Sequence, residues 1–274
     1  MFKKMVAVFL CISAMTCIFT GCSNLLNIPQ SDEYKEYNHE EEHSVQSEQD
    51  ESGILNKRQM KILMQEGLPT DYNKLTDTQK KSIERIEELL QYLDNKYDCT
   101  FSYLGYSSGG VLEEEWLEAY PDTLNSSYPC KVYVDEEGNI ADTGNEAFAR
   151  REVNRLLKNE LNDHINTEIK IYTECQYNGT EIVDGMGQIA GNTIVYADVF
   201  VEGKDQKNNL KKLADYAADW YKKYQINGSV NFIMVDEDYF PQISISNYSH
   251  TKIENNTEIF LTCDIDKNGN VKIY

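Results

Sequence analysis

Residues 168–177 read EIKIYTECQY. Apolar and charged side chains alternate along this stretch: Ile169, Ile171 and Cys175 against Glu168, Lys170 and Glu174. A period of two places successive side chains on opposite faces of a strand, so that one face is buried and the other meets water. Half-buried strands of this kind belong to antiparallel sheets, because the strands of a parallel sheet are apolar on both faces. The stretch therefore predicts one strand of an antiparallel sheet.

The same period recurs elsewhere between turn-forming residues, and few of these segments have the continuous apolar runs of buried parallel strands. We expect further strands at residues 100–105, 116–120, 130–135, 193–201, 230–236, 242–248, 258–265 and 271–274.

Other segments follow the helical period instead. The clearest begins with the capping-box pattern Thr76-Asp77-Thr78-Gln79, after which the apolar residues fall on one helix face. We expect helices at residues 55–65, 77–97, 145–165 and 206–225. Three to four helices packed on mainly antiparallel sheet define an α+β fold.

Two segments of the folded region are similar to each other. Residues 134–140 (VDEEGNI) align with residues 265–271 (IDKNGNV), and the same offset moves the helix at 77–97 onto 208–228. The similarity predicts a tandem helix-plus-sheet duplication. The alternative is coincidence, because turns with this composition are common in unrelated hairpins. The two halves would be residues 54–142 and 143–274.

The N-terminus has the three parts of an export signal. Lys3 and Lys4 give a positive start, residues 5–20 are almost entirely apolar, and Gly21 stands directly before Cys22. An uncleaved membrane anchor is the alternative, but the apolar run is shorter than the roughly 20 residues that span a bilayer.

The cysteine at the cleavage point makes this segment resemble the signal peptide of bacterial lipoproteins. Phe19 departs from the aliphatic residue that is usual at its position. The resemblance implies a signal peptide at residues 1–21 and lipid attachment at Cys22. It implies nothing about the rest of the chain.

Residues 22–53 are expected to form a disordered acidic tether. Between Ser31 and Gly53, nine acidic residues stand against Lys35 alone, so the segment has too little apolar surface to fold. Residues 39–43 (HEEEH) match the H-E-x-x-H zinc pattern, but no apolar neighbours would bury such a helix. We therefore interpret them as tether, and we expect the folded domain at residues 54–274.

The chain carries a net charge of −20, from 46 acidic and 26 basic residues. Binding to nucleic acid is excluded, because it requires a basic surface that replaces counterions. Anionic lipid headgroups would also repel this surface, so membrane attachment must come from the lipid. A cationic peptide or protein partner is compatible with the charge.

Four cysteines remain after the predicted signal peptide and the lipidated cysteine: Cys99, Cys130, Cys175 and Cys263. An exported domain permits disulfides. Four cysteines allow three pairings, and buried free thiols are equally compatible with the pattern. Both interpretations stay open.

No motif for catalysis, a cofactor or a metal fulfils its structural requirements. Residues 264–269 begin like a calcium loop, and residues 185–190 match a loose dinucleotide fingerprint, but both lie where turns between strands are expected. The acidic residues 113–115 are interpreted as a solvated face. We expect a protein that is not an enzyme and that has no cofactor or metal site.

Nineteen tyrosines and two tryptophans make the chain rich in aromatic residues. Such side chains give large contact areas with a polar tip, which suits binding surfaces. Trp116, Tyr120 and Tyr128 lie in a polar setting rich in Gly, Ser and Asn. They are the candidate ligand-binding residues.

As a whole, the chain resembles the surface lipoproteins of low-GC Gram-positive bacteria. We expect it on the extracytoplasmic face of the cell membrane, where it would be held by its lipid. The leading hypothesis is a non-catalytic binding module that captures a cationic peptide or partner. The alternatives are a surface enzyme that acts on the cell wall and a solute-binding lipoprotein of a transporter.

Overall fold

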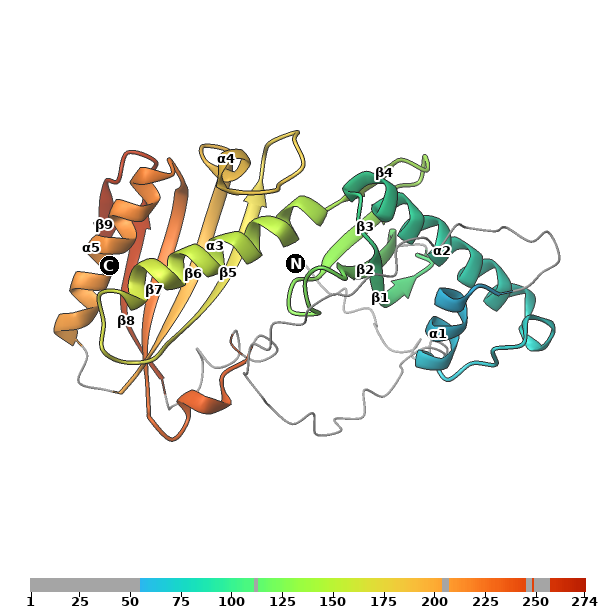
Figure 1. Ribbon diagram of the computed structural model, residues 1–274, viewed down its shortest axis with the longest axis horizontal. Helices are drawn as coiled ribbons and strands as arrows, with labels where there is room; N and C mark the ends of the chain where they lie inside the picture. The colour runs from blue at the N-terminus through green and yellow to red at the C-terminus, as the bar shows by residue number, and fades with distance from the viewer. Residues whose placement is uncertain (1–54, 111–112, 204–206, 245–247, 249–256) are drawn as a thin grey trace, which may run out of the picture. The chain divides into compact units, whose positions relative to one another are not determined.

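Figure 1 shows the protein as a computed structural model that describes residues 55–110, 113–203, 207–244, 248 and 257–274. The predicted signal peptide, Cys22 and the tether at 22–53 lie outside the described residues. The chain separates into two compact units, residues 1–75 and 76–274. Among the described residues, no helix combines the length and apolar character that crossing a membrane requires.

The described part of the first unit contains the helix α1 (Lys57–Gln65) and the 3-10 turn η1 (Tyr72–Lys74). Asn56 caps α1 in a reciprocal capping box, in which its side chain accepts from Gln59 N at 2.8 Å and its own N–H donates to Gln59 Oε1 at 2.9 Å. The helix ends just before Gly67, whose φ is +70°. The helix predicted at 55–65 is therefore confirmed.

The second unit opens with α2 (Asp77–Tyr97), which the Thr76–Gln79 capping box begins as predicted. A four-stranded antiparallel meander follows it: β1 (Phe101–Ser107), β2 (Glu115–Pro121), β3 (Cys130–Val134) and β4 (Ile140–Asp142). The buried stripe of α2 packs on one face of this sheet, and it contains the predicted residues Ile83, Ile86, Leu89, Leu90, Leu93 and Tyr97.

A buried carboxylate joins the end of this sheet to the helix. The side chain of Asp142 is 0% exposed and accepts from Lys96 Nζ at 2.6 Å. It also accepts from the hydroxyls of Tyr92 and Tyr97 at 2.7 and 2.6 Å, and from Gly144 N at 3.0 Å. Because Gly144 begins the next helix, one side chain fixes three consecutive parts of the fold.

The second sheet has five strands in the order β5-β6-β7-β8-β9. Its elements are α3 (Gly144–Asn162), β5 (Ile169–Tyr177), α4 (Met186–Ile189), β6 (Thr193–Glu202), α5 (Lys207–Lys223), β7 (Asn227–Val235), β8 (Thr257–Ile265) and β9 (Val271–Ile273). Only β6 and β7 pair in parallel, and α5 connects them. Two mainly antiparallel sheets with helices confirm the predicted α+β class.

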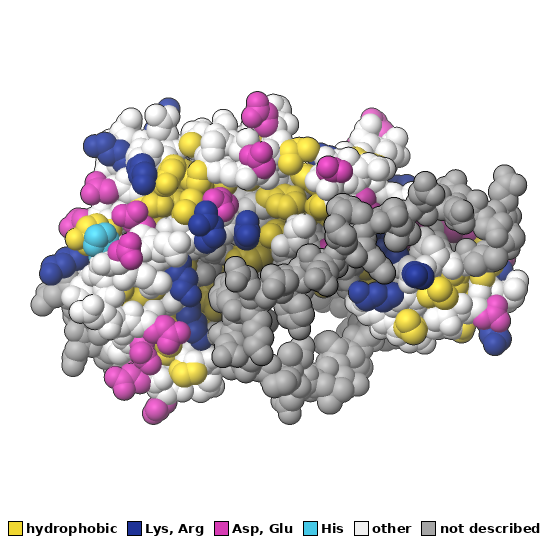
Figure 2. Space-filling view, in the orientation of Figure 1, with side chains coloured by type: hydrophobic (Ala, Val, Ile, Leu, Met, Phe, Trp, Pro, Cys, Tyr) yellow, Lys and Arg dark blue, Asp and Glu magenta, His cyan; other side chains and the backbone are white. Residues whose placement is uncertain are grey.

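Helices α3 and α5 cover the same face of the second sheet (Figure 1). Their core contains Val153 and Leu157 from α3, Trp220 and Tyr221 from α5, and alternate residues of the strands. Along these helices, apolar side chains reach the surface among charged ones (Figure 2). A second apolar cluster on the sheet contains Phe200, Ile233, Val235, Phe240 and Ile243.

The strand expected at residues 242–248 is wrong for its described residues. The chain forms a short 3-10 turn instead, η2 (Phe240–Gln242), and the next two residues belong to no strand. Pro241 has no N–H for a sheet ladder. In addition, Lys170 Nζ donates to the carbonyl oxygens of Phe240, Pro241 and Ile243 at 3.0, 3.2 and 3.0 Å. These carbonyls are therefore satisfied by an ammonium group rather than by a neighbouring strand.

The two segments that align in the sequence form turns with the same hydrogen bonds. Asp135 accepts from Asn139 N at 2.8 Å and from Asn139 Nδ2 at 2.9 Å. Asp266 accepts from Asn270 N at 2.9 Å and from Asn270 Nδ2 at 2.8 Å. Each turn joins the last two strands of its sheet. The duplication with halves at 54–142 and 143–274 stays a prediction.

All four cysteines of the folded region are free thiols. Cys130, Cys175 and Cys263 are buried, and Cys99 is half-buried. Burial raises the pKa of Cys130 and Cys175 to about 12 and that of Cys99 and Cys263 to about 11. The thiols are therefore protonated at neutral pH.

Candidate functional site

The candidate binding surface lies on the face of the first sheet that points away from α2. Along β2, Leu117 and Ala119 are 0% exposed and belong to the core. The side chains of Trp116, Glu118 and Tyr120 alternate with these two and point to the opposite face of the sheet. On β3, those of Lys131 and Tyr133 point to the same face. We call this surface the aromatic face and define it as Trp116, Glu118, Tyr120, Lys131 and Tyr133.

Trp116 is the central side chain of the aromatic face. It is half-buried, and it pairs across the strands with Tyr133, which is 36% exposed. Its indole lies beside Gly105 of β1, where a Cβ atom would be 3.6 Å from the indole Cζ3. The Lys131 ammonium stands over the ring, 5.2 Å from its centroid. The indole is therefore a platform that already holds one cation.

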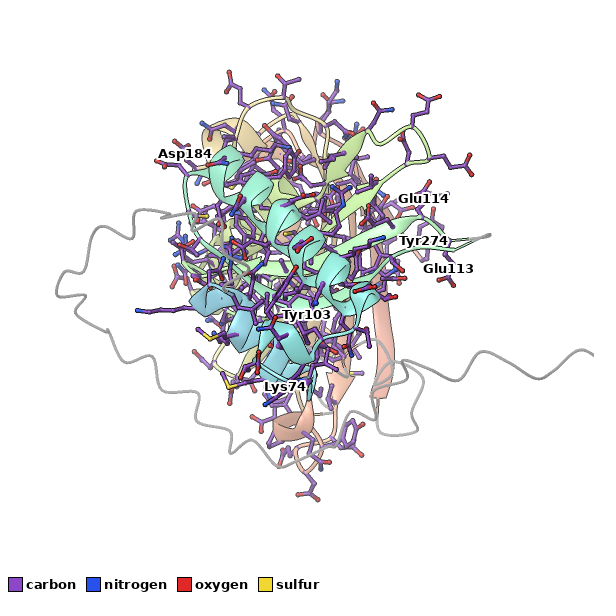
Figure 3. All side chains as sticks on the ribbon, turned by 90° about the vertical axis from the view of Figure 1, so that its right-hand side faces the viewer. Lys74, Tyr103, Glu113, Glu114, Asp184 and Tyr274 are labelled. Carbon is purple, nitrogen blue, oxygen red and sulfur yellow. The ribbon has the colours of Figure 1, made fainter. Side chains whose placement is uncertain are left out.

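Next to the aromatic face, an acidic hollow of about 360 Å³ lies at the end of the sheet. Two residues of its lining, Glu115 and Val134, form the cross-strand pair that follows Trp116 and Tyr133. Because side chains alternate along a strand, this pair points to the α2 side of the sheet, and the hollow and the aromatic face share only the end of the strands. We call it the acidic hollow, and its lining is Ser108, Gly109, Gly110, Glu113, Glu114, Glu115, Val134, Asp135 and Glu136. Figure 3 shows Glu113 and Glu114 together beyond the end of the strands.

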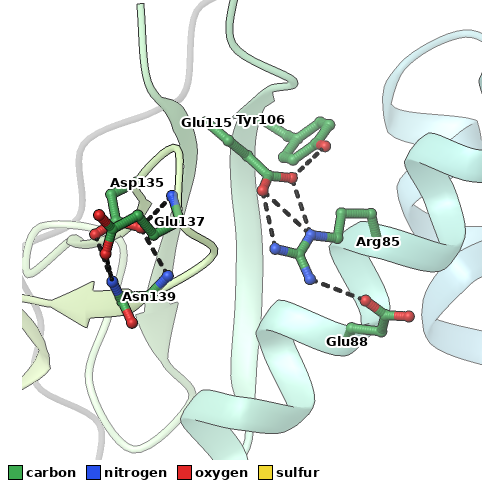
Figure 4. A network of polar contacts seen from close by, with 7 residues as sticks. All are labelled: Arg85, Glu88, Tyr106, Glu115, Asp135, Glu137 and Asn139. Carbon is green, nitrogen blue, oxygen red and sulfur yellow. Dashed lines mark hydrogen bonds and ion pairs between the residues drawn. The ribbon is translucent and has the colours of Figure 1, made fainter.

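One wall of the acidic hollow is fixed by an ion-pair network (Figure 4). Glu115 accepts from Arg85 Nε at 3.0 Å, from Arg85 Nη2 at 2.9 Å and from the Tyr106 hydroxyl at 2.7 Å. Burial raises the pKa of Glu115, but the hydrogen bonds from Arg85 and Tyr106 outweigh it and leave that pKa below its usual value. Burial and the bond to Glu115 raise the pKa of Tyr106. Glu115 is therefore a charged structural anchor between β2 and α2.

Another wall is the β3–β4 turn, also drawn in Figure 4. Asp135 accepts from Glu137 N and Asn139 N, which lowers its pKa, with the hydrogen bonds from Asn139 as the main cause. Asp135 and Glu115 are thus occupied by internal contacts. The remaining carboxylates, of Glu113, Glu114 and Glu136, are exposed, and no ion pair to them occurs within the described residues. These three are the ones available to a ligand.

The ligand-binding role of Trp116, Tyr120 and Tyr128 stays a prediction, and the structure shows where the three residues lie. Trp116 and Tyr120, two of the three candidate residues, lie on the aromatic face. The third, Tyr128, lies in the β2–β3 connection, where its N–H donates to Asn125 O at 3.0 Å. Lys131 and Tyr133 were missed. Alternation within residues 130–134 could have indicated them, since Cys130, Val132 and Val134 are the buried set.

The described residues contain no group of three or more His, Cys, Asp or Glu that could hold a metal ion. The site offers an aromatic platform, three exposed carboxylates and a hollow large enough for one or two side chains.

Comparisons with known proteins add nothing to the α+β class that the structure shows. No family model matches the chain, and no match is found among curated proteins. A solved structure of a DUF5037 family protein from Ruminococcus gnavus ATCC 29149 is similar over 57% of this chain and 77% of that chain. Its sequence identity is 11% and its TM-score is 0.35. A likeness of this size does not establish a shared fold or function.

Proposed function

We propose that this protein is a lipid-anchored, extracytoplasmic binding module without catalytic activity. The lipobox-like end of the apolar segment, Gly21-Cys22, supports the anchor. A diacylglycerol together with an N-acyl chain would hold the protein stably at the membrane, where one chain would not. The acidic tether at 22–53 would keep the folded part away from the bilayer.

The proposed ligand is a cationic peptide segment. One observation carries this proposal: the three available carboxylates of Glu113, Glu114 and Glu136 line a hollow at the end of the same two strands, β2 and β3, that carry the aromatic platform. A lysine or arginine side chain could place its charge among the carboxylates and its neighbours against Trp116 and Tyr133. Exposed charge pairs contribute about 0.2–1 kcal/mol each, so three of them give modest, salt-sensitive binding.

Binding is tested by titrating the protein with a peptide of six arginines, using a peptide of six glutamines for comparison. We expect the triple variant Glu113→Gln, Glu114→Gln, Glu136→Gln to weaken binding about tenfold, since it removes about three exposed pairs. The matched control changes the exposed acids Glu181→Gln, Asp184→Asn and Asp219→Asn, which lie away from the hollow. If both variants weaken binding equally, the hollow is not the site.

The anchor is tested in the native host with Cys22→Ser in the full chain. We expect loss of metabolic labelling by a palmitate analogue and release of the protein from the membrane fraction. Labelling that persists in this variant would contradict lipid attachment at Cys22.

A further inference from the structure

Lys131 occupies the place where a ligand cation would be expected. Its ammonium lies 5.2 Å from the centroid of the Trp116 ring, within the range of about 6 Å for a cation–π contact. Tryptophan is the strongest aromatic partner for a cation. In the unbound protein, the Trp116 ring is therefore already in contact with the ammonium group of Lys131.

The Trp116 indole can lie flat on the sheet because Gly105 beside it has no side chain. Gly105 and Lys131 both pair with Glu118, from opposite sides of β2. Trp116 is two residues from Glu118 on the same face, and its six-membered ring lies over Gly105. Because glycine leaves space, the indole can lie along the sheet beside β1 while Lys131 approaches from β3.

Lys131 also has a second place for its charge. Glu118 is its direct cross-strand partner, and directly opposed residues have Cβ atoms about 5 Å apart. A Lys131 side chain that left the indole could therefore meet a carboxylate without leaving the sheet surface. If the Lys131 ammonium moved from the Trp116 ring to the Glu118 carboxylate, it would exchange one favourable electrostatic contact for another.

We propose that Lys131 is an internal competitor that covers Trp116 in the unbound protein and is displaced by a lysine or arginine of the cationic peptide. This inference rests on the proposed function, and it deepens it by naming the residue that sets the affinity. Charge complementarity supports the occupant, because the exposed carboxylates of Glu113, Glu114 and Glu136 lie at the end of the two strands that carry Trp116 and Lys131. Once Lys131 is displaced, a cationic side chain of the peptide would stack on the Trp116 ring, and other cationic side chains would pair with the carboxylates of the acidic hollow.

The inference predicts a gain in affinity when a side chain is removed. Lys131→Met should tighten binding of the six-arginine peptide by about two- to fivefold, the factor that one exposed cation–π contact is worth. Lys131→Arg keeps both the charge and the stacking and should bind as the unaltered protein does. Trp116→Leu should weaken binding.

A double-mutant cycle separates stacking from net charge. Removing Lys131 also makes the surface more negative, but that effect is the same with or without the indole. In the Trp116→Leu background, Lys131→Met should therefore give a smaller gain than in the unaltered protein. Trp116→Phe, which keeps a weaker ring, replaces Trp116→Leu if circular dichroism shows that the leucine variant is unfolded.

The outcomes distinguish the two proposals. If the unaltered protein does not bind the six-arginine peptide, the proposed function fails. If it binds, but Lys131→Met gives the same gain in both backgrounds or no gain in either, the role of Lys131 is overturned. A gain that depends on Trp116 supports it.

Discussion

Asp142 and Lys170 each connect parts of the chain that are far apart in the sequence. The Asp142 carboxylate accepts from Tyr92, Lys96 and Tyr97 of α2. The Lys170 ammonium donates to three carbonyls about seventy residues later. Charged groups that are buried or nearly buried are tolerated only when every charge is met by partners. Asp142 meets that condition with a side chain that is 0% exposed, whereas Lys170 is half-buried. Both should be sensitive to substitution, because each holds several partners.

For Asp142→Asn we expect a loss of about 2 kcal/mol in the free energy of unfolding, because the amide nitrogen that replaces one oxygen of the buried carboxylate cannot accept the hydrogen bonds that this oxygen accepts. Burial raises the pKa of Asp142, but the hydrogen bonds from Lys96, Tyr92 and Tyr97 outweigh it and leave the pKa below its unfolded value of about 3.9. The stabilisation is thus present above about pH 4 and is lost as pH falls through the folded pKa.

Urea unfolding as a function of pH checks this prediction. The difference between the unaltered protein and Asp142→Asn should shrink as the pH falls below about 4. The exposed Asp184→Asn variant is the control and should change stability little at any pH. A difference that does not depend on pH would contradict the assignment.

Lys170→Met should destabilise the protein by about 2 kcal/mol, since three carbonyl oxygens lose a charged donor. Lys158→Met, at an exposed position of α3, is the matched control. The change is measured by urea unfolding, and equal effects of the two substitutions would show that the carbonyl contacts contribute nothing.

At the level of elements, the sequence predicted most of the fold because the periods are long and regular. The helix at 77–97 and the strand at 168–177 agree with α2 and β5 to within a residue. The misses have physical causes. β4 and α4 have three and four residues, which is too short for a period to show. The strand expected at 242–248 is wrong because Lys170, distant in sequence, binds the carbonyl of Ile243 within it and those of Phe240 and Pro241 just before it.

The sequence proposes part of the aromatic face for a related reason. Aromatic residues in a polar setting can be recognised in a sequence, so Trp116 and Tyr120 could be named as candidates, and their role in binding stays a prediction. The roles of Lys131 and Gly105 depend on the pairing of the strands, which places these two residues on either side of Glu118. A pairing between strands cannot be read from one strand.

The two similar turns allow a matched comparison at the element scale. Gly138 and Gly269 have φ values of +83° and +78°, so alanine at either position is strained by about 1 kcal/mol or more. A Cβ at Gly138 would meet nothing within 4 Å, whereas at Gly269 it would lie 2.9 Å from Lys222 Cβ. Gly269→Ala should therefore lower the melting temperature more than Gly138→Ala. The reverse order would contradict the packing of α5 against the second turn.

For the whole second unit, α3 is the element that belongs to both sheets. Its first turns contact the first sheet and its helix: Asn145 N donates to the Tyr97 hydroxyl at 3.1 Å, and Arg150 donates to the carbonyl of Pro129. Its later turns, with Val153 and Leu157, lie in the core of the second sheet. Because α3 lies in the core of the second sheet and is hydrogen-bonded to the first sheet's helix and to the residue before β3, we expect the two sheets to unfold together.

The two tryptophans report on the two sheets separately, since Trp116 lies on β2 and Trp220 on α5. In the single-tryptophan variants Trp220→Phe and Trp116→Phe, the urea transition seen by fluorescence should coincide with that seen by circular dichroism of the same variant. A fluorescence midpoint that departs from the circular dichroism midpoint would show that the sheets unfold independently.

The reactivity of the free thiols reports how often the folded protein opens. Three are buried and all four are protonated at neutral pH, so an oxidant or alkylating reagent meets almost no thiolate on the folded chain. Modification of the three buried thiols then proceeds through transient openings, and its rate measures how often they occur. In the extracytoplasmic compartment proposed for this protein, intact thiols would mark the molecules that folded faster than they were oxidised.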